Sequence, residues 1–205
     1  MGTILVRDGA VLGAEGWLDP GYVVIDGENI AAVGRGEPPA DLVAEAEMVI
    51  PARHMAVLPG LVNAHTHISQ TLMRGIAAGR PLLRWLHERI WPLQAAMSVV
   101  EMSLAALLGL VENLRCGVIH VVDHHKITTT PAHTDAVCQA ALTVGVRLTL
   151  ARGWADLGPD GEAPDHILAD LERLFAGPLG HRVRIANGPL VPWRCSARTL
   201  QETHR

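Results

Sequence analysis

The first part of the chain alternates short apolar runs with turn-forming residues. Turns are predicted at Asp8-Gly9, at Asp19-Pro20-Gly21 and at Asp26-Gly27, and glycine and proline residues between positions 34 and 39 interrupt the pattern. Short strands at this spacing predict a small β-sandwich or sheet. The predicted strands cover residues 3–7, 22–25, 29–33, 47–50 and 55–58.

From residue 59 the pattern changes to apolar strands that alternate with amphipathic helices. Ser98 and Glu101 form a capping-box pattern before one helix, and Gly145 is placed to end another. Such alternation predicts a parallel sheet with right-handed crossovers. The predicted strands are 60–65, 117–123, 146–151 and 182–186, and the predicted helices are 80–94, 98–114, 130–144, 164–175 and a last one from Ser196.

These patterns predict an α/β chain with two regions. Residues 1–58 would be the N-terminal portion of a β-sandwich, and residues 59–205 a partial (β/α) barrel containing strands 1–4. Four β/α units are the first half of a TIM-type (β/α)8 barrel, which typically needs about 250 residues. Because the last predicted helix is still running at Arg205, we expect this chain to be part of a longer enzyme.

Composition excludes several classes of protein. The net charge is −4 with both signs interspersed, so no basic stripe indicates nucleic acid. No apolar run approaches the ~18 residues of a membrane span, and no signal peptide is evident, so we expect no membrane contact and a cytoplasmic location. Cys116, Cys138 and Cys195 are too few and too widely spaced for a disulfide framework or a cysteine zinc site.

His65 and His67 are the main candidates for chemistry. They follow the apolar run at residues 58–62, and residues two apart on a strand point to the same side. Imidazole is a good ligand for zinc and iron. The H-x-H spacing alone is weak evidence, and its position at the end of a predicted barrel strand is what makes it a metal-site candidate.

Five sequence blocks resemble the amidohydrolase superfamily, in its cytosine, guanine and 8-oxoguanine deaminase and chlorohydrolase-like branch. Their order and spacing cover essentially the whole chain. The blocks are PGLVNAHTH (59–67), RWLHERIWP (84–92), GVIHVVDHH (117–125), GVRLTLARG (145–153) and NGPLVPWRCS (187–196).

The resemblance implies a metal-dependent aminohydrolase that acts on the C–N bond of a purine-like or other nitrogen heterocycle. His65 and His67 would be ligands of one divalent metal, most simply zinc, with iron as the alternative. A metal-bound hydroxide would attack the ring carbon, and the other ligands and the proton-transferring residue are expected beyond Arg205. The alternatives are a triazine-type chlorohydrolase, an adenosyl-type nucleoside deaminase, or a truncated, inactive chain.

Four further residues are candidates for contact with a small heterocyclic substrate. The resemblance implies that Gln70 binds the edge of the heterocycle, since an amide both donates and accepts hydrogen bonds. His124 would line the pocket or fix a loop. Arg152 would bind an anionic or carbonyl group, or form an ion pair with a neighbouring loop. Trp193 would form a pocket wall or simply pack.

Two departures from the family pattern bear on the substrate. Arg84 stands where adenosyl-type deaminases usually carry a glutamate for ribose hydroxyls, and Leu190 stands where many relatives have a histidine. Both changes favour a free base or another small heterocycle. A homodimer, with Trp85 and Trp91 at the interface, is a further expectation from the resemblance.

Overall fold

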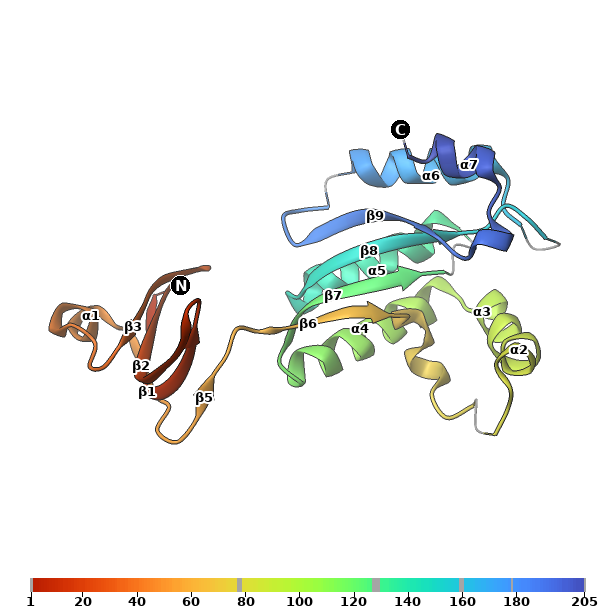
Figure 1. The fold of residues 1–205 in the computed structure, drawn as a ribbon. Coiled ribbons are helices and arrows are strands. Elements are labelled where there is room, and N and C mark those ends of the chain that lie inside the picture. Colours follow the sequence, from red (N-terminus) through yellow and green to blue (C-terminus); the bar gives the residue numbers. More distant parts are fainter. Residues whose placement is uncertain (1, 77–78, 127–129, 159–160, 178, 205) are drawn as a thin grey trace. The chain divides into compact units, whose positions relative to one another are not determined.

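The computed structural model describes residues 2–76, 79–126, 130–158, 161–177 and 179–204 (Figure 1). The chain forms two compact units, Met1–Pro59 and Gly60–Arg205, which are described separately below.

The first unit contains one mixed sheet. Its main path has the order β3-β2-β1-β4, and β5 also pairs with β1. The hairpin partners β1 and β2 are antiparallel, as are β2 and β3, whereas β4 and β5 run parallel to β1. Leu5, Val11 and Val24 are buried in this unit. The elements are β1 (Thr3–Gly13), β2 (Gly16–Asp26), β3 (Asn29–Arg35), α1 (Ala40–Glu45), β4 (Met48–Pro51) and β5 (Ala56–Val57).

Two predicted turns in this unit are wrong. Asp8-Gly9 is an irregularity within β1, where the register with β2 shifts and Asp8 adopts φ 68°. A Cβ on Gly9 would lie 2.9 Å from the Ala52 carbonyl oxygen, so glycine permits this close approach. Residues 19–21 likewise lie inside β2 rather than at a turn. The turn at Asp26-Gly27 is confirmed as the connection between β2 and β3.

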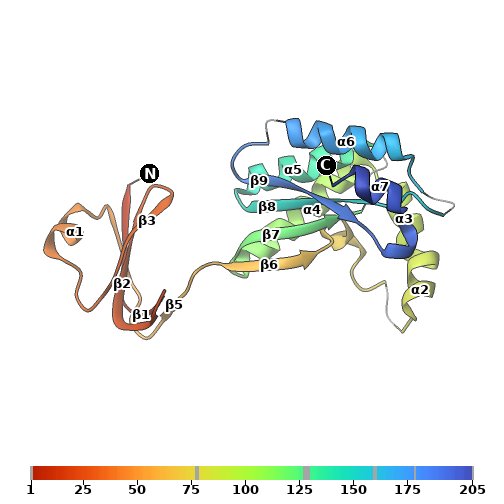
Figure 2. The same cartoon turned by 45° about the horizontal axis from the view of Figure 1, so that its top comes forward.

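The second unit is a parallel sheet with the order β6-β7-β8-β9, as the β/α alternation predicts. Figures 1 and 2 show α4, α5 and α6 along one face of this sheet. The elements are β6 (Leu61–Thr66), η1 (Ile68–Met73), α2 (Leu82–Trp85), the π-helical turn η2 (Leu86–Ile90), α3 (Trp91–Ala96), α4 (Val99–Arg115), β7 (Val118–His125), α5 (Pro131–Val144), β8 (Arg147–Trp154), α6 (Pro164–Ala176), β9 (Val183–Pro189), η3 (Pro192–Arg194) and α7 (Ala197–Glu202).

Local signals set several of these helix ends. Ser98 and Glu101 form the predicted capping box, and Gly145 ends α5 in the left-handed conformation. The Ser196 side chain caps α7 as expected. The 3-10 helix η1 and the π-helical turn η2 were not predicted.

The core of the second unit lies between the sheet and its helices. Leu148 and Leu150 of β8 are buried against Leu110 of α4 and Val137 of α5 in one apolar cluster. In the described part of the chain no single helix is long and apolar enough to cross a membrane. Only the bent pair Leu82–Ala96 and Val99–Arg115 meets that length and composition jointly, with 111° between its members.

Candidate functional site

A bulge in β6 sets the direction of the histidine pair. Asn63 pairs with Val121 and Thr66 pairs with Asp123, so three residues of β6 span two residues of β7. Val121 and Asp123 are both buried on the helix-covered side of the sheet. Thr66 therefore faces the helices, and its neighbours His65 and His67 face the opposite side. Without the bulge, His65 would share the side of Asn63.

Three imidazoles meet at the carboxyl ends of β6 and β7. The ring centroids of His65 and His67 are 5.0 Å apart, and His124 lies 6.5 Å from His65 and 5.5 Å from His67. The Nδ1 of His67 donates to the His124 carbonyl oxygen at 2.8 Å, which leaves its Nε2 as the lone-pair nitrogen. The Nε2 of His124 donates to the Gly188 carbonyl oxygen on β9 at 3.0 Å. The predicted residues His65, His67 and His124 are therefore brought together.

The electrostatics around His67 favour its neutral imidazole form. Burial lowers the pKa of His67, and the nearby His124, His65 and Lys126 lower it further, against the opposing hydrogen bond to the His124 carbonyl. Neutral imidazole is the form that binds a metal ion. His67 is thus a chemically suitable donor, and the adjacent imidazole of His65 offers a second nitrogen. Across the described residues, however, no group of three or more histidine, cysteine or acidic side chains is placed to hold an ion.

Asp123 anchors the segment that carries His67. Its Oδ1 accepts a hydrogen bond from the Ile68 backbone N–H at 2.8 Å, and its Oδ2 lies 3.7 Å from the Nδ1 of His125. Both side chains are fully buried. Burial raises the pKa of Asp123 to about 7, although the Ile68 N–H opposes the shift. The carboxyl group therefore fixes the backbone directly after His67, although its burial disfavours the ionised carboxylate.

Replacement of Asp123 by asparagine should change the pH dependence of stability. The folded-state pKa of Asp123 is above its unfolded value, so this group contributes stability at low pH that is lost as pH rises from about 4 to about 7. Asparagine keeps an acceptor for Ile68 but does not titrate. Relative to Asp123→Asn, the original chain should lose about 2–4 kcal/mol across that window. Urea unfolding between pH 4.5 and 7.5 measures this loss. Asp41→Asn, at an exposed carboxylate, is the control, and parallel profiles for Asp123→Asn and the original chain would contradict the assignment.

Gln70 is not part of the imidazole cluster, although it lies close to His67. It belongs to η1, where its N–H bonds the His67 carbonyl oxygen at 2.9 Å. With His67, Trp85 and Glu112 it lines a cavity of about 390 Å³ that also touches α4. Gln70 and His67 therefore lie in the wall of the same cavity.

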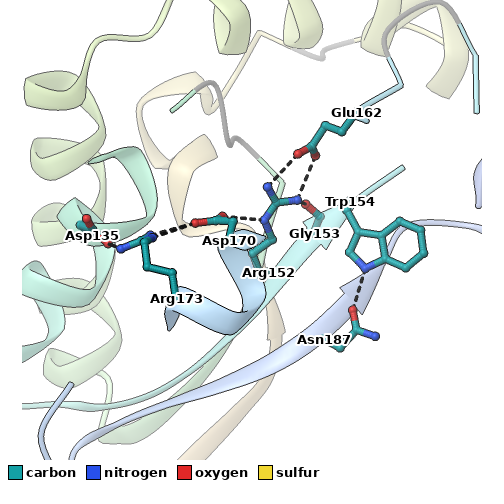
Figure 3. A network of polar contacts seen from close by, with 8 residues as sticks. All are labelled: Asp135, Arg152, Gly153, Trp154, Glu162, Asp170, Arg173 and Asn187. Atoms are coloured by element: carbon teal, nitrogen blue, oxygen red, sulfur yellow. Dashed lines mark hydrogen bonds and ion pairs between the residues drawn. The ribbon is translucent and has the colours of Figure 1, made fainter. Parts of the chain in front are cut away.

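Arg152 does not join the imidazole cluster but belongs to the ion-pair network drawn in Figure 3. It is only 3% exposed, and its guanidinium bonds both oxygens of Glu162, at 3.0 and 2.7 Å, and the Oδ2 of Asp170, at 2.9 Å. Arg173 continues the network by bonding Asp170 and Asp135. The alternation of β8 turns Arg152 to the helix-covered side, so the structure shows the ion-pair alternative rather than an anion-binding group on the imidazole side.

The remaining candidates are spread over the unit. Trp193 is 76% exposed in η3 and does not line the cavity shared by Gln70 and His67. Arg84 of α2 pairs with Glu88 of η2, and its side chain is exposed. Trp85 and Trp91 are partly buried and pack against the main apolar cluster of this unit.

Sequence inspection missed the residues that position the histidines. The amide of Asn63 donates to Asn113 of α4 at 2.9 Å and fixes β6 ahead of the bulge. Asp123 fixes the chain after it. The alternation Val121, Asp123, His125 indicated one buried side of β7, and a carboxyl group there was the available signal.

A parallel β/α sheet with an imidazole cluster at its carboxyl edge is typical of barrel enzymes, whose active sites lie at the carboxyl ends of the strands. The sequence model of the Amidohydrolase family matches residues 56–203, so the chain belongs to this family.

Curated relatives and solved structures agree with this assignment. The 5'-deoxyadenosine deaminase of Methanothermobacter thermautotrophicus is 36% identical over 204 residues, which are 98% of this chain and 45% of the relative. The 5-methylthioadenosine/S-adenosylhomocysteine deaminase of Syntrophomonas wolfei is 31% identical over a stretch that covers 93% of this chain and 42% of the relative. Atrazine chlorohydrolase TrzN from Arthrobacter aurescens TC1, solved with zinc, superposes with a TM-score of 0.82 and 25% identity, over 96% of this chain and 48% of its own. The chain thus spans about half the length of these proteins, and the predicted half of a TIM-type barrel is confirmed.

Proposed function

We propose that this chain contributes the first metal ligands and part of the substrate pocket of a metal-dependent aminohydrolase acting on a purine-like heterocycle. The observation that carries the proposal is the pair His65 and His67, with ring centroids 5.0 Å apart at the carboxyl end of the first barrel strand. The names of the curated relatives, which are deaminases of adenosine derivatives, support the reaction class.

The residues of this chain would have separate roles at the metal site. His65 and His67 would hold one divalent ion, with zinc favoured because the zinc complex of the chlorohydrolase shares this fold. When bound, such an ion lowers the pKa of a water molecule, so that a nucleophile exists near neutral pH. The His124 carbonyl would keep the His67 Nε2 directed at the ion by holding its Nδ1–H. Structural zinc sites use four ligands and catalytic ones about three, so further ligands from outside the described residues are required.

Substrate selection would rest on groups near this pair. The Gln70 amide can donate to and accept from a ring edge, and His67 and Gln70 line one cavity. The relatives favour an adenosine derivative. The Arg84 side chain cannot accept hydrogen bonds from ribose hydroxyls, which favours a free base as the substrate instead. A triazine chlorohydrolase is the second candidate, because the zinc-bound chlorohydrolase has the same fold at 25% identity.

Loss of either histidine should remove both metal and activity. The natural protein that carries this sequence would be assayed for zinc content and for ammonia release from 5'-deoxyadenosine, 5-methylthioadenosine and guanine, and for chloride release from atrazine. We expect His65→Ala and His67→Ala to lose the bound metal and to lower kcat/KM by at least about 10³-fold. Removal of the metal with a chelator should do the same, and added zinc should restore activity.

His204→Ala, at an exposed histidine of the same unit, is the matched control and should keep both metal and turnover. Full activity of His67→Ala would refute the assignment of the metal ligands. Chloride release without ammonia release would replace the aminohydrolase by the chlorohydrolase.

A further inference from the structure

The connection between β9 and α7 begins beside the imidazole cluster. Gly188, near the end of β9, accepts a hydrogen bond from the His124 Nε2–H at 3.0 Å. Two residues later, the Leu190 N–H donates to the Trp154 carbonyl oxygen at 3.0 Å. The β9 loop, residues 190–195, therefore starts at a point that is attached both to His124 and to the end of β8.

Asp156, two residues after the end of β8, holds the other end of this loop. Its Oδ1 accepts the Ser196 N–H at 2.7 Å. Its Oδ2 accepts the Ser196 hydroxyl at 2.5 Å and the Thr199 hydroxyl at 2.6 Å. The Asp156 N–H also donates to the Arg194 carbonyl oxygen at 3.2 Å. One residue from the β8 side thus fixes both the last part of the β9 loop and the residue that caps α7.

The carboxylate form of Asp156 is well suited to this contact. Burial raises its pKa, but the hydrogen bonds from Ser196 and Thr199 outweigh burial and hold the pKa below its ordinary value. Hydrogen bonds to an ionised acceptor are shorter and stronger than those between neutral groups. The side chain therefore adds three strong bonds to the single backbone bond that it makes with Arg194.

The end of β8 is itself a firm support. Trp154 is buried, and its Nε1–H donates to the Asn187 Oδ1, which joins β8 to β9 (Figure 3). The Arg194 Nε donates to the Leu157 carbonyl oxygen at 2.8 Å. A six-residue loop with both ends attached to a buried strand end has little conformational freedom to lose when a ligand binds.

We infer that Asp156 is a positioning residue for substrate binding, because it holds the β9 loop beside the imidazole cluster as a preformed wall of the substrate site. This inference rests on the proposed function, since it concerns the same site and the same purine-like heterocycle. A wall that is ordered before binding lowers the entropy cost of binding. His65 and His67 are held through β6 and β7 instead, so Asp156 should affect the substrate and not the metal.

Steady-state kinetics of Asp156→Ala would test this role in the natural protein that carries this sequence, with the best substrate among those assayed above. KM should rise about 5- to 100-fold, because the released loop must then be ordered when the substrate binds. Zinc content should be unchanged, and kcat should stay within about 2-fold, since a higher KM at constant kcat marks lost binding rather than lost chemistry. An unchanged KM would overturn the inference.

Asp156→Asn separates position from charge. Asparagine keeps an acceptor for the Ser196 N–H, and its amide can donate to the oxygens of the Ser196 and Thr199 hydroxyls. KM should therefore return close to the value of the original protein. A large loss of kcat in Asp156→Asn would instead show that the carboxylate takes part in the reaction, and would overturn a positioning role.

Ser98→Ala is the matched control for stability. It removes a capping side chain from α4 instead of α7, so it should also destabilise the chain but leave KM unchanged. An equal rise of KM in Ser98→Ala would mean that general destabilisation causes the effect, and would overturn the inference.

Hydrogen–deuterium exchange measures the order of the loop without any assay of activity. Peptides that cover residues 190–196 should exchange faster in Asp156→Ala than in the original protein, Asp156→Asn or Ser98→Ala. Unchanged exchange in Asp156→Ala would show that Asp156 does not hold the loop. Absence of turnover by the original protein would refute the proposed function together with this inference, whereas turnover with an unchanged KM in Asp156→Ala would refute the inference alone.

Discussion

Replacement of Arg152 by methionine is expected to lower the free energy of unfolding by about 3–5 kcal/mol. The guanidinium is buried and serves two carboxylates at once, Glu162 in the segment before α6 and Asp170 within α6 (Figure 3). Methionine has a similar volume but leaves Asp170, which is 8% exposed, with one cationic partner fewer. The effect therefore comes from the buried Asp170 Oδ2, which loses its partner while Arg173 still holds Oδ1, rather than from a cavity.

Urea unfolding of Arg152→Met, Arg152→Lys and Arg198→Met would test whether loss of the buried ion pair causes the destabilisation. Arg198→Met removes an exposed i,i+4 pair with Glu202 and should cost less than about 1 kcal/mol. Arg152→Lys keeps the positive charge but cannot form the bidentate pair with Glu162. Its loss of unfolding free energy should therefore lie between those of Arg152→Met and Arg198→Met. If Arg152→Met were no more destabilising than Arg198→Met, the network would not stabilise this unit.

Replacement of Trp154 by alanine should destabilise the chain by about 3–5 kcal/mol. Trp154 is 1% exposed and forms a separate apolar cluster with Ile167, Leu171 and Cys195. Its Nε1–H donates to the Asn187 Oδ1 at 2.6 Å, so the side chain also joins β8 to β9. Alanine would leave a large cavity and an acceptor without its donor.

Two tryptophan variants serve as controls in the same denaturation experiment. Trp154→Phe keeps most of the packing and should cost about 1–3 kcal/mol through the lost hydrogen bond. Trp193→Ala removes an exposed ring and should change stability by no more than about 0.5 kcal/mol. Equal losses for Trp154→Ala and Trp193→Ala would contradict the packing described for Trp154.

Some features follow from residues that are close together in the sequence. The capping box of Ser98 and Glu101 and the left-handed Gly145 are local choices, and the structure confirms both. The β/α alternation after residue 59 is also local in origin, because apolar periodicity distinguishes a buried strand from an amphipathic helix. The parallel order of β6, β7, β8 and β9 then follows from the crossover rule.

Other features depend on partners that the local sequence does not reveal. Asp8-Gly9 has the composition of a turn, but β1 continues through it to Gly13 because it pairs with β2 on both sides of it, with β4 before it and with β5 after it. Arg152 lies at the expected strand end, yet the register of β8 against β7 and the presence of Asp170 on α6 turn it away from the histidines. Side-chain direction in a strand depends on register, and register is set by residues that are distant in the sequence.

Patterns along the chain are enough to predict a β-rich first region, a half barrel of β/α units and a histidine pair at the end of the first barrel strand. The direction of that pair depends on strand pairing. A bulge between Asn63 and Thr66 turns His65 and His67 to the side away from the helices, and Asp123 holds the backbone that follows. Both effects arise where β6 meets β7, more than 50 residues later in the chain, so no local pattern could contain them.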